Sequence, residues 1–362
     1  MKPKGPVISP PPLRGRIGVR RLVEDYFTAY NAARLQEACR LLAEKVLRPG
    51  VTVGVSLSGA LTPAGLAGSA LVPLIRAGFI DYLVSTGANL YHDLHYSLGY
   101  RLHRSRPRVD DTELRRRGLV RIYDIVFDSA VLFGTDRFCR EALDDPARPL
   151  LSTAELHHRL GQLARQAERE RGLRRPGLLA AAYRADVPIY TSSPGDSAIG
   201  MNLAALALQG QGPLIDVSAD VNETAAIVYQ ATRGRGKSAV LILGGGSPKN
   251  FLLQTEPHIQ EILGLGERGH DYFIQVTDAR PDTGGLSGAT PSEAVSWGKI
   301  DPARLPDAVV CYTDSTIALP IMAAYVLEAA RRRPLRRLYR QRRQLLEKLR
   351  RAAARRQRSG EG

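Results

Sequence analysis

Cysteine is scarce in this chain of 362 residues, which contains Cys39, Cys139 and Cys311 and no Cys-x-x-Cys spacing. An odd number of widely separated thiols argues against a disulfide framework and against a cysteine zinc site. No apolar run approaches the ~20 residues that span a bilayer, and the first twelve residues lack the apolar stretch of a signal peptide. We therefore expect a cytoplasmic protein without a membrane segment, because the reducing cytoplasm suits such thiols.

Signatures of two other chemistries are also missing. The chain has no Gly-x-Ser-x-Gly elbow, and nothing designates a Ser-His-Asp set. His92 and His95 lie close together in the sequence, but no cysteine or further histidine lies near them at metal-ligand spacing. We expect no metal site, and a metal held by these histidines is the less favoured alternative.

The positive charge is concentrated at the C-terminal end. The net charge is +15, but residues 331–362 hold 14 Lys or Arg against two acids and account for +12, which leaves +3 for the first 330 residues. A body this close to neutral lacks the footprint of whole-protein nucleic-acid binding. Five leucines, Leu335, Leu338, Leu345, Leu346 and Leu349, fall at near-helical spacing and predict a helix after Pro334. Its interpretation as an RNA or acidic-partner tail stays open, but we favour a solvated, arginine-rich helix.

Short apolar runs alternate with helix-length segments along most of the chain. The runs are rich in Val, Ile and Leu without polar alternation, which is typical of strands buried on both faces of a parallel sheet. The expected strands are Val51–Leu57, Phe79–Ser85, Val120–Phe127, Val187–Thr191, Leu214–Val217, Ala239–Leu243, Tyr272–Val276 and Ala308–Tyr312. Expected helices between them include Pro63–Arg76, Thr153–Arg169, Asn222–Thr232 and Ser315–Ala330. This alternation predicts an α/β fold with a Rossmann-like, doubly wound, mostly parallel sheet and flanking helices.

We expect one large domain with two basic extensions. Residues 1–16 are predicted to be a flexible, Pro-rich basic arm, and residues 17–330 the α/β domain. Residues 331–362 are the basic C-terminal extension.

Small and acidic residues follow several expected strands at their carboxyl ends, where open α/β sheets bind ligands. Gly244, Gly245 and Gly246 follow one strand and permit a tight turn and close approach of the backbone to a ligand. Ser247 is expected to cap the next helix, whose N-terminus suits a phosphate. A plain strand-to-helix turn is an equal alternative for this segment alone. Similar signals follow four other strands, at Thr86, Asp196, Asp278 and Asp314, and together they favour a nucleotide crevice.

The only tryptophan, Trp297, lies two residues before Lys299 and four residues after Glu293. A lysine held beside an indole loses solvent, which lowers its pKa and makes the amine a nucleophile. A nearby carboxylate can pair with an amine substrate. A packed loop with a solvated lysine is the alternative, and these residues alone do not exclude it.

The string Glu-Ala-Val-Ser-Trp-Gly-Lys at residues 293–299, with Gly244–Gly246 and Ser287–Ala289 before it, resembles deoxyhypusine synthase. Weaker similarity extends from about Leu22 to Ala330. The resemblance implies a homotetrameric, NAD-dependent transferase with sites at subunit interfaces. In that family NAD takes a hydride from spermidine, the aminobutyl part is held as an imine on a lysine, and an acceptor amine receives it.

The resemblance also implies roles for individual residues. Lys299 matches the imine-forming lysine, and Trp297, Glu293 and Asn250 match substrate-binding positions. The positions that match the NAD site are Thr86, Asp196, Gly244, Gly245, Gly246, Asp278, Ala279, Gly284 and Asp314.

Four departures from the family pattern concern amine recognition. Met201 and Leu286 stand where the family has polyamine-binding aspartates, Asn250 replaces an active-site histidine, and Tyr91-His92 replaces a pair of glutamates. A buried ammonium without a charge partner costs several kcal/mol, so spermidine is not expected to bind in the usual way. A local shift of the match is the alternative, in which Asn202 or Asp282 substitutes in space.

The leading hypothesis is therefore an alkylamine transferase that acts on a polyamine and delivers its aminobutyl-type group to a small amine. Homospermidine synthesis is the first alternative, and modification of a lysine of a translation factor is the second. A non-catalytic NAD-binding protein is an alternative from another class, and nucleic acid is expected to contact at most the basic tail.

Overall fold

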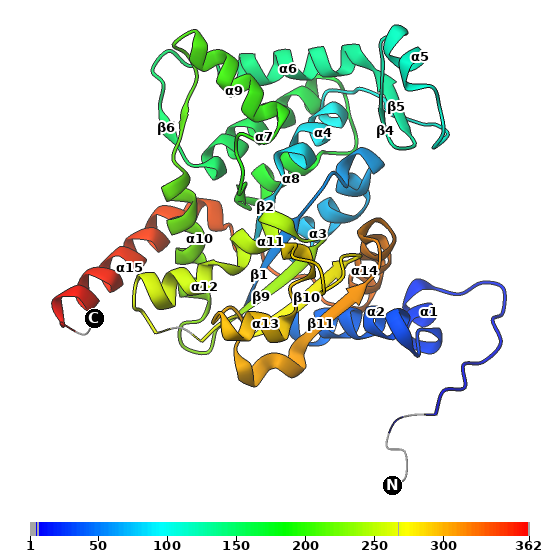
Figure 1. The fold of residues 1–362 in the computed structure, drawn as a ribbon, viewed down its shortest axis with the longest axis vertical. Coiled ribbons are helices and arrows are strands. Elements are labelled where there is room, and N and C mark those ends of the chain that lie inside the picture. Colours follow the sequence, from blue (N-terminus) through cyan, green and yellow to red (C-terminus); the bar gives the residue numbers. More distant parts are fainter. Residues whose placement is uncertain (1–4, 6, 267, 361–362) are drawn as a thin grey trace.

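A six-stranded parallel sheet forms the centre of the computed structural model, which describes residues 5, 7–266 and 268–360 (Figure 1). Its strands are β1 (Val51–Leu57), β2 (Tyr82–Ser85), β7 (Ile189–Tyr190), β9 (Lys237–Leu243), β10 (Tyr272–Thr277) and β11 (Ala308–Tyr312). They lie in the order β11-β10-β9-β1-β2-β7. This is the doubly wound order, with the winding direction reversing between β1 and β9. The predicted α/β fold is confirmed.

The parallel register places the carboxyl ends of the central strands level with one another. Leu57 at the end of β1 pairs with Ser85 on one side and with Leu243 on the other. Farther along the sheet, Thr277 pairs with Tyr312. The loops that follow these strands therefore emerge side by side at one edge.

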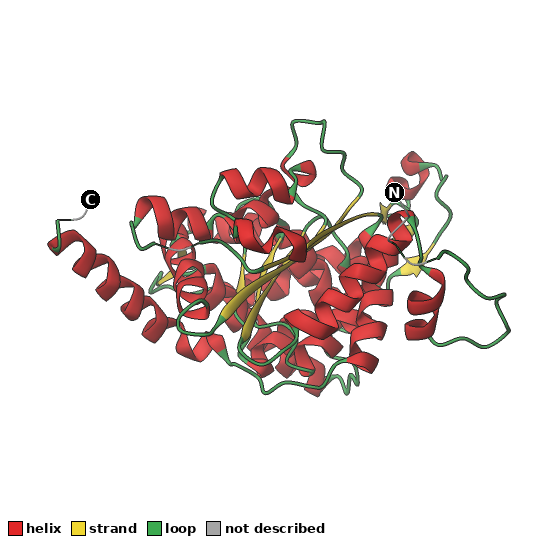
Figure 2. Ribbon diagram, turned by 90° about the horizontal axis from the view of Figure 1, so that it is seen from below, coloured by secondary structure: helices red, strands yellow, loops and turns green. Residues whose placement is uncertain are grey.

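Helices cover both faces of the sheet (Figure 2). Successive residues of β9 show this, because Leu241 and Leu243 belong to one buried apolar cluster, whereas Val240 and Ile242 belong to another. The helices are α1 (Val19–Tyr26), α2 (Tyr30–Leu41), α3 (Val72–Arg76), α4 (Gly87–Ser97), α5 (Asp111–Arg116), α6 (Ser129–Leu143), α7 (Thr153–Glu170), α8 (Leu178–Ala185), α9 (Ala198–Leu208), α10 (Val217–Ala231), α11 (Gly246–Leu253), α12 (Thr255–Pro257), α13 (Pro291–Ser296), α14 (Ser315–Ala329) and α15 (Leu338–Arg358). Short 3-10 or π segments are η1 (Leu42–Val46), η2 (Thr62–Ala64), η3 (Ala67–Leu71), η4 (His258–Ile262), η5 (Leu286–Gly288) and η6 (Pro302–Asp307).

Two expected strands are not part of the parallel sheet. The segment 120–127 forms an antiparallel hairpin of β4 (Leu119–Ile122) and β5 (Ile125–Asp128), which also pairs with β3 (His103–Arg104). The turn between β4 and β5 contains Tyr123 at φ 51°, a left-handed conformation that apolar periodicity cannot signal. The expected strand at 214–217 is reduced to β8 (Leu214–Ile215), which pairs with β6 (Leu150–Leu151).

The helix expected over 63–76 is also interrupted. It is divided among η2, η3 and α3, and Gly65 between the first two has φ 76°. A left-handed glycine ends a helical turn, which explains the break.

The helix expected after Pro334 is present as α15, but the solvated-helix interpretation is wrong for one of its sides. Leu338, Leu345 and Leu349 are buried in the same apolar cluster as residues of α10, and the two helices lie side by side (Figure 1). Arg333, just before the helix, forms an ion pair of 3.0 Å with the buried Asp81. At the other end of the chain, residues 7–16 contain no helix or strand, and residues 1–4 and 6 of the expected arm lie outside the described residues.

All three cysteines are fully buried, at 0% exposure. Burial raises the pKa of Cys39 and of Cys139 to about 12 and that of Cys311 to about 11. Over the described part of the chain, no helix is both long and apolar enough to cross a membrane.

Candidate functional site

The turn between β9 and α11 requires glycine at successive positions. Gly244 and Gly246 have φ of 85° and 59°, in the left-handed region. A Cβ added at Gly245 would lie 2.4 Å from the Cα of Ser287, so only glycine lets these two segments approach. At Gly246 the added Cβ would meet no atom within 4 Å, so the start of α11 faces open space.

The expected helix cap at Ser247 is wrong. The helix begins at Gly246, two residues before the start that a Ser247 cap implies, its N-cap is Gly245, and no side chain caps it. The N–H of Gly246 donates instead to Ser287 Oγ at 2.8 Å. The Ser247 hydroxyl is thereby available to donate to Ser192 Oγ at 2.8 Å, which links this turn to the loop after β7.

Loops from four strands meet at this edge of the sheet. The N–H of Gly245 donates to Ser58 Oγ, directly after β1, at 3.1 Å. Thr86, directly after β2, is the N-cap of α4 and donates to the Gly59 carbonyl at 2.6 Å. Gly87 lies so close to Ser197, at the start of α9, that an added Cβ would be 2.3 Å from its Oγ.

The remaining residues expected to bind the cofactor lie along the same edge. Asp278 follows β10 and is exposed, and Asp314 follows the adjacent β11 and caps α14 by accepting from the Thr316 N–H at 2.8 Å. Asp196 is exposed in the loop between β7 and α9, and Gly284 is exposed in the loop between β10 and α13. The expected positions thus share one side of the sheet, and NAD binding by them stays a prediction.

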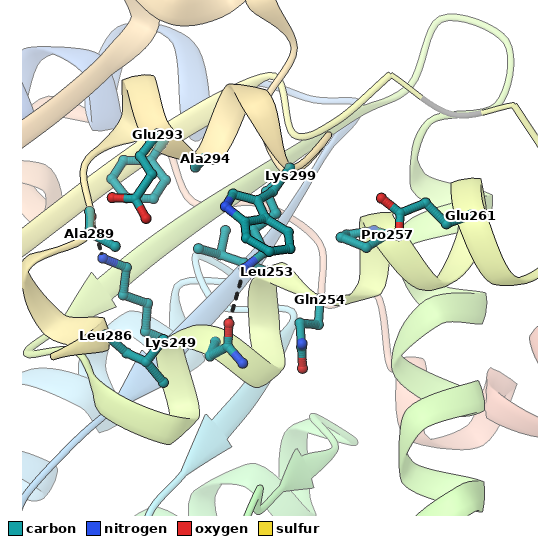
Figure 3. Close-up of a pocket in the computed structure, with 13 residues that line it drawn as sticks. Lys249, Leu253, Gln254, Pro257, Glu261, Leu286, Ala289, Glu293, Ala294 and Lys299 are labelled. Atoms are coloured by element: carbon teal, nitrogen blue, oxygen red, sulfur yellow. Dashed lines mark hydrogen bonds between the residues drawn. The ribbon is translucent and has the colours of Figure 1, made fainter. Parts of the chain in front are cut away.

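Lys299 lies in a pocket of about 350 Å³ beside this edge (Figure 3). Its Nζ donates to Asn250 Oδ1 at 3.0 Å and lies 5.6 Å from the centre of the Trp297 ring. Burial lowers the pKa of Lys299, and the Glu293 carboxylate partly opposes that shift. The structure therefore brings together the four residues expected for catalysis and substrate binding.

The walls of the pocket are mostly apolar. Leu286 points into it from η5 and Trp297 borders it, with 49% and 56% of their surfaces exposed. Its acidic residues are Glu293 and Glu261, both exposed to solvent. The complete lining is Lys249, Asn250, Leu253, Gln254, Pro257, Glu261, Phe273, Leu286, Ala289, Glu293, Ala294, Trp297 and Lys299.

Lys249 is a second lysine in the pocket and was not predicted from the sequence. It is 3% exposed, and its Nζ donates to Gln275 Oε1 at 2.9 Å and to the Ala289 carbonyl at 2.7 Å. Burial lowers its pKa to about 8, a shift that the Glu293 carboxylate partly opposes and to which the Lys299 charge contributes. Its position directly before Asn250, an expected substrate-binding residue, was the one signal in the sequence that placed it near the site. A lysine in the first turns of a helix is normally solvated, so this signal did not predict burial.

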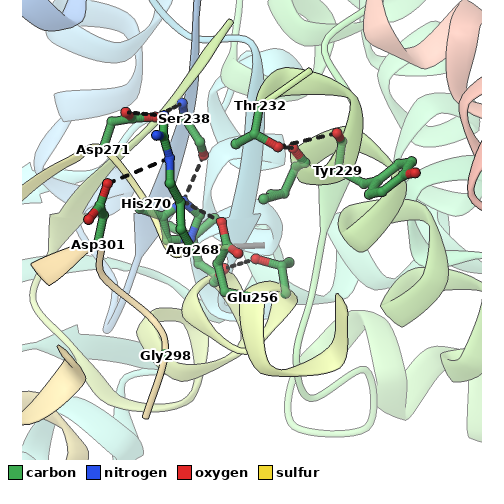
Figure 4. Close-up of polar contacts among 12 residues, drawn as sticks. Tyr229, Thr232, Ser238, Glu256, Arg268, His270, Asp271, Gly298 and Asp301 are labelled. Atoms are coloured by element: carbon green, nitrogen blue, oxygen red, sulfur yellow. Dashed lines mark hydrogen bonds and ion pairs between the residues drawn. The ribbon is translucent and has the colours of Figure 1, made fainter. Parts of the chain in front are cut away.

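The backbone around Lys299 is held from behind by a buried polar cluster (Figure 4). The His270 N–H donates to the Lys299 carbonyl at 3.0 Å, and the His270 ring lies 2.7 Å from Ser238 Oγ. The Gln260 amide donates to the carbonyl of Gly298 at 2.7 Å. These contacts hold the backbone of the segment that carries Lys299, while the side-chain amine of Lys299 lies in the pocket.

Neither residue considered as a spatial replacement for the missing aspartates is available. Asn202 is 4% exposed, donates to Asp136 at 2.8 Å and accepts from Arg140 at 2.6 Å, so its amide is used within the fold. Asp282 is exposed and forms a two-contact ion pair with Arg280. Met201 itself is 65% exposed on α9.

The two histidines of α4 contact each other. His92 Nδ1 lies 3.0 Å from His95 Nε2, and His95 Nδ1 lies 2.8 Å from Thr135 Oγ1. Burial lowers the pKa of both rings, that of His95 to about 3. Among the described residues, no group of three or more His, Cys, Asp or Glu side chains is arranged to hold a metal ion.

Known proteins are similar to this chain in sequence and in fold. The family model of deoxyhypusine synthase matches residues 21–326. A deoxyhypusine synthase-like protein from Cyanothece sp. is 64% identical over 350 residues, which are 95% of this chain and 88% of that protein. Probable deoxyhypusine synthase 2 of Methanosarcina mazei is 37% identical over 305 residues, 84% of this chain and 85% of that protein. The crystal structure of a candidate deoxyhypusine synthase from Entamoeba histolytica has a TM-score of 0.55 at 12% identity and covers 88% of this chain and 96% of that one, a likeness of fold alone.

Proposed function

Because the chain belongs to the deoxyhypusine synthase family, we propose that it is an NAD-dependent alkylamine transferase that carries an aminobutyl-type group as an imine on Lys299. Membership supports NAD-dependent aminobutyl transfer. The observation that carries the assignment to Lys299 is its half-buried amine, which has a lowered pKa and a hydrogen bond to Asn250 inside a pocket.

The residues at the carboxyl edge fit a dinucleotide. Space is open in front of Gly246, the first residue of α11, so the N-terminus of this helix can receive a pyrophosphate. The exposed carboxylates of Asp278 and Asp314 suit ribose hydroxyls. Bound NAD would supply hydride acceptance from the carbon next to the substrate nitrogen and hydride return at the end.

Lys299 supplies the covalent step. Its unprotonated amine adds to the oxidised C–N carbon and expels the original amine, so that one C–N bond forms as another breaks. The acceptor amine later displaces Lys299 in the same manner, and the lysine is recovered. Asn250 orients the amine, and the Glu293 carboxylate offers a partner to an ammonium group of the substrate.

The donor and acceptor are proposed from the pocket walls. We propose a polyamine donor that pairs with Glu293 and a small amine as acceptor, since apolar groups surround the site and Leu286 offers no charge. Homospermidine synthesis is the first alternative, and modification of a translation-factor lysine is the second. A protein that binds NAD without catalysis is the third.

We also propose that the chain forms a homotetramer with its sites at subunit interfaces. Trp297 at the pocket and Met201 on α9 support this, because each leaves more than half of a large apolar side chain exposed. Light scattering after gel filtration would detect four copies, and a monomer at micromolar concentration would reject the assembly.

Borohydride trapping tests the proposed function. Incubation with NAD and a polyamine, followed by borohydride, should leave an aminobutyl adduct on the peptide that contains Lys299. Lys299→Arg keeps the charge but lacks the nucleophile, so it should lose the adduct while binding NAD normally. Lys45→Arg is the matched control, because Lys45 is an exposed lysine paired with Asp307 and no part of the pocket.

Mass spectrometry of the products separates the alternatives. Homospermidine formed from putrescine identifies the first alternative, and labelling of an added translation factor identifies the second. NAD binding without an adduct for any tested amine would overturn the transferase proposal and support the third.

A further inference from the structure

The helix α15 lies beyond the segment that matches the family model. The family match ends at residue 326, and α15 begins at Leu338. Nothing in the proposed transfer chemistry requires this helix. Its 21 residues contain nine Lys or Arg and one acid, Glu347.

One side of α15 fixes it rigidly to the domain. Leu345 and Leu349 are 4% and 2% exposed and pack in the cluster that contains Ala225 and Val228 of α10. Arg342 is buried on the same side, where it forms ion pairs with Glu155 and Glu223. The helix is therefore held in place, and its opposite side is presented to solvent as a fixed surface.

That opposite side, which we call the basic face, consists of exposed cations. Its members are Arg340, Arg343, Lys348, Arg350, Arg351, Arg355 and Arg358. Glu347 neutralises part of this charge through contacts of 3.2 Å with Arg350 and 2.8 Å with Arg351. Two acids of the domain also contribute, since Asp186 lies 2.9 Å from Arg340 and Glu155 lies 3.6 Å from Arg343. The apolar side of α15 thus packs on the domain, as in other surface helices. The basic face makes no apolar contact with the domain and is exposed to a partner.

We propose that the basic face of α15 binds the phosphate backbone of nucleic acid. A helix of 21 residues is about 31 Å long at about 1.5 Å per residue, so its charges can follow several successive phosphates. All members but Lys348 are arginines, whose planar guanidinium groups pair with phosphate through two hydrogen bonds. The first 330 residues carry a net charge of only +3, so the basic charge that phosphates would meet is concentrated at this end of the chain.

The basic face lacks the features that two other kinds of anionic partner require, a membrane surface and an acidic protein. A helix that binds a membrane surface buries an apolar side among the lipids, but the apolar side of α15 is occupied by α10. A protein partner is normally anchored by aromatic or aliphatic side chains that enter pockets, and the basic face consists of charged side chains alone. Phosphate recognition requires neither.

Four neutralising substitutions test the surface and leave the apolar contacts of α15 and the Arg342–Glu155 ion pair in place. The variant Arg343→Gln, Lys348→Gln, Arg355→Gln, Arg358→Gln removes four charges from the basic face and keeps Glu347 with both of its partners. The matched control Arg101→Gln, Arg104→Gln, Arg106→Gln, Arg108→Gln removes four exposed charges from another part of the surface. Removal of residues 331–362 is unsuitable, since it would also unpair Asp81 and uncover α10.

The measurement is fluorescence anisotropy of labelled duplex DNA, duplex RNA and single-stranded RNA over a range of salt concentrations. The unaltered chain should bind at least one of them, with log K falling linearly against log salt. The basic-face variant should bind at least 10-fold more weakly, and on duplex DNA its salt slope should be smaller by about 3 to 4, at about 0.9 per phosphate contact. The control should keep both the affinity and the slope.

Three outcomes would overturn the proposal. One is absence of binding to all three nucleic acids at 100 mM salt, roughly physiological ionic strength. Another is an equal loss of affinity in the control. The third is binding of polyglutamate or of vesicles rich in phosphatidylserine as tightly as the best nucleic acid. None of these outcomes depends on transferase activity, so the two proposals fail separately.

Discussion

Lys299 Nζ donates a hydrogen bond of 3.0 Å to Asn250 Oδ1, and this contact aims the amine into the pocket. A hydrogen bond from a lysine amine orients the group, but an amide cannot take its proton at neutral pH. Asn250 therefore orients the Lys299 amine, whereas burial lowers its pKa and so favours loss of the proton.

Replacement of Asn250 by leucine should slow adduct formation without preventing it. Leucine has a similar size but accepts no hydrogen bond, and hydrogen bonds to charged groups contribute about 1.5–3 kcal/mol. We expect trapping to be roughly 10- to 100-fold slower, measured by mass spectrometry of the quenched reaction. Gln254→Leu is the control from the same pocket, and an unchanged rate in Asn250→Leu would remove Asn250 from the orienting role.

Replacement of Leu286 by aspartate should strengthen spermidine binding. Leu286 projects into the pocket at 49% exposure, and a carboxylate there would give a second ammonium group a partner. We expect the Kd for spermidine, measured by calorimetry with saturating NAD, to fall about 5- to 10-fold, or roughly 1 kcal/mol. Leu286→Asn has the same shape without the charge and should leave Kd unchanged. An equal gain from asparagine would show that charge is not the missing element.

The buried Lys249 should make stability rise with pH on the alkaline side. Its folded-state pKa is about 8, below the ordinary lysine value of 10.5. Between these values the unfolded chain binds more protons, so unfolding becomes harder as pH increases. The unfolding free energy of the unaltered chain minus that of Lys249→Met should grow by about 2 kcal/mol from pH 8 to pH 10. Urea titrations at each pH measure it, and the difference cancels the tyrosines and cysteines that titrate in the same range. A constant difference would mean that Lys249 keeps an ordinary pKa.

Loss of Arg333 should destabilise the fold by about 2–3 kcal/mol. Its guanidinium pairs with Asp81 at 3.0 Å, and both side chains are more than nine-tenths buried. Arg333→Met leaves the Asp81 carboxylate with the Val53 N–H and the more distant Arg336 as partners, and an incompletely paired buried charge is costly. The exposed neighbour gives the control, since Arg332→Met should change the free energy of unfolding by less than about 0.5 kcal/mol. Equal effects in the two variants would mean that the ion pair does not stabilise the fold.

The parallel sheet was predictable because its strands are buried on both faces. Val51–Leu57 and Ala308–Tyr312 were predicted with the observed bounds, since continuous apolar runs carry that signal. The hairpin at 119–128 was not, because its residues are only partly buried and its turn depends on a left-handed Tyr123. The position of α15 against α10 was not predictable either. Its leucines indicate one apolar side but not which helix that side contacts.

The pocket was predictable only in part. The family string located Trp297 and Lys299, which lie together as expected. The burial of Lys249 depends on Gln275 and Ala289, which come from distant segments and cannot be paired from sequence alone. The same holds for Asn202, whose side chain is occupied by Asp136 and Arg140.

The three buried thiols give the chain a practical property. Thiolate is the reactive form, and groups with pKa values of about 11 to 12 hold almost none of it at neutral pH. A maleimide probe should therefore ignore the native protein and react only with an introduced surface cysteine, for instance in place of Arg358. The natural cysteines can remain, and their slow labelling would report how often the core around each of them opens.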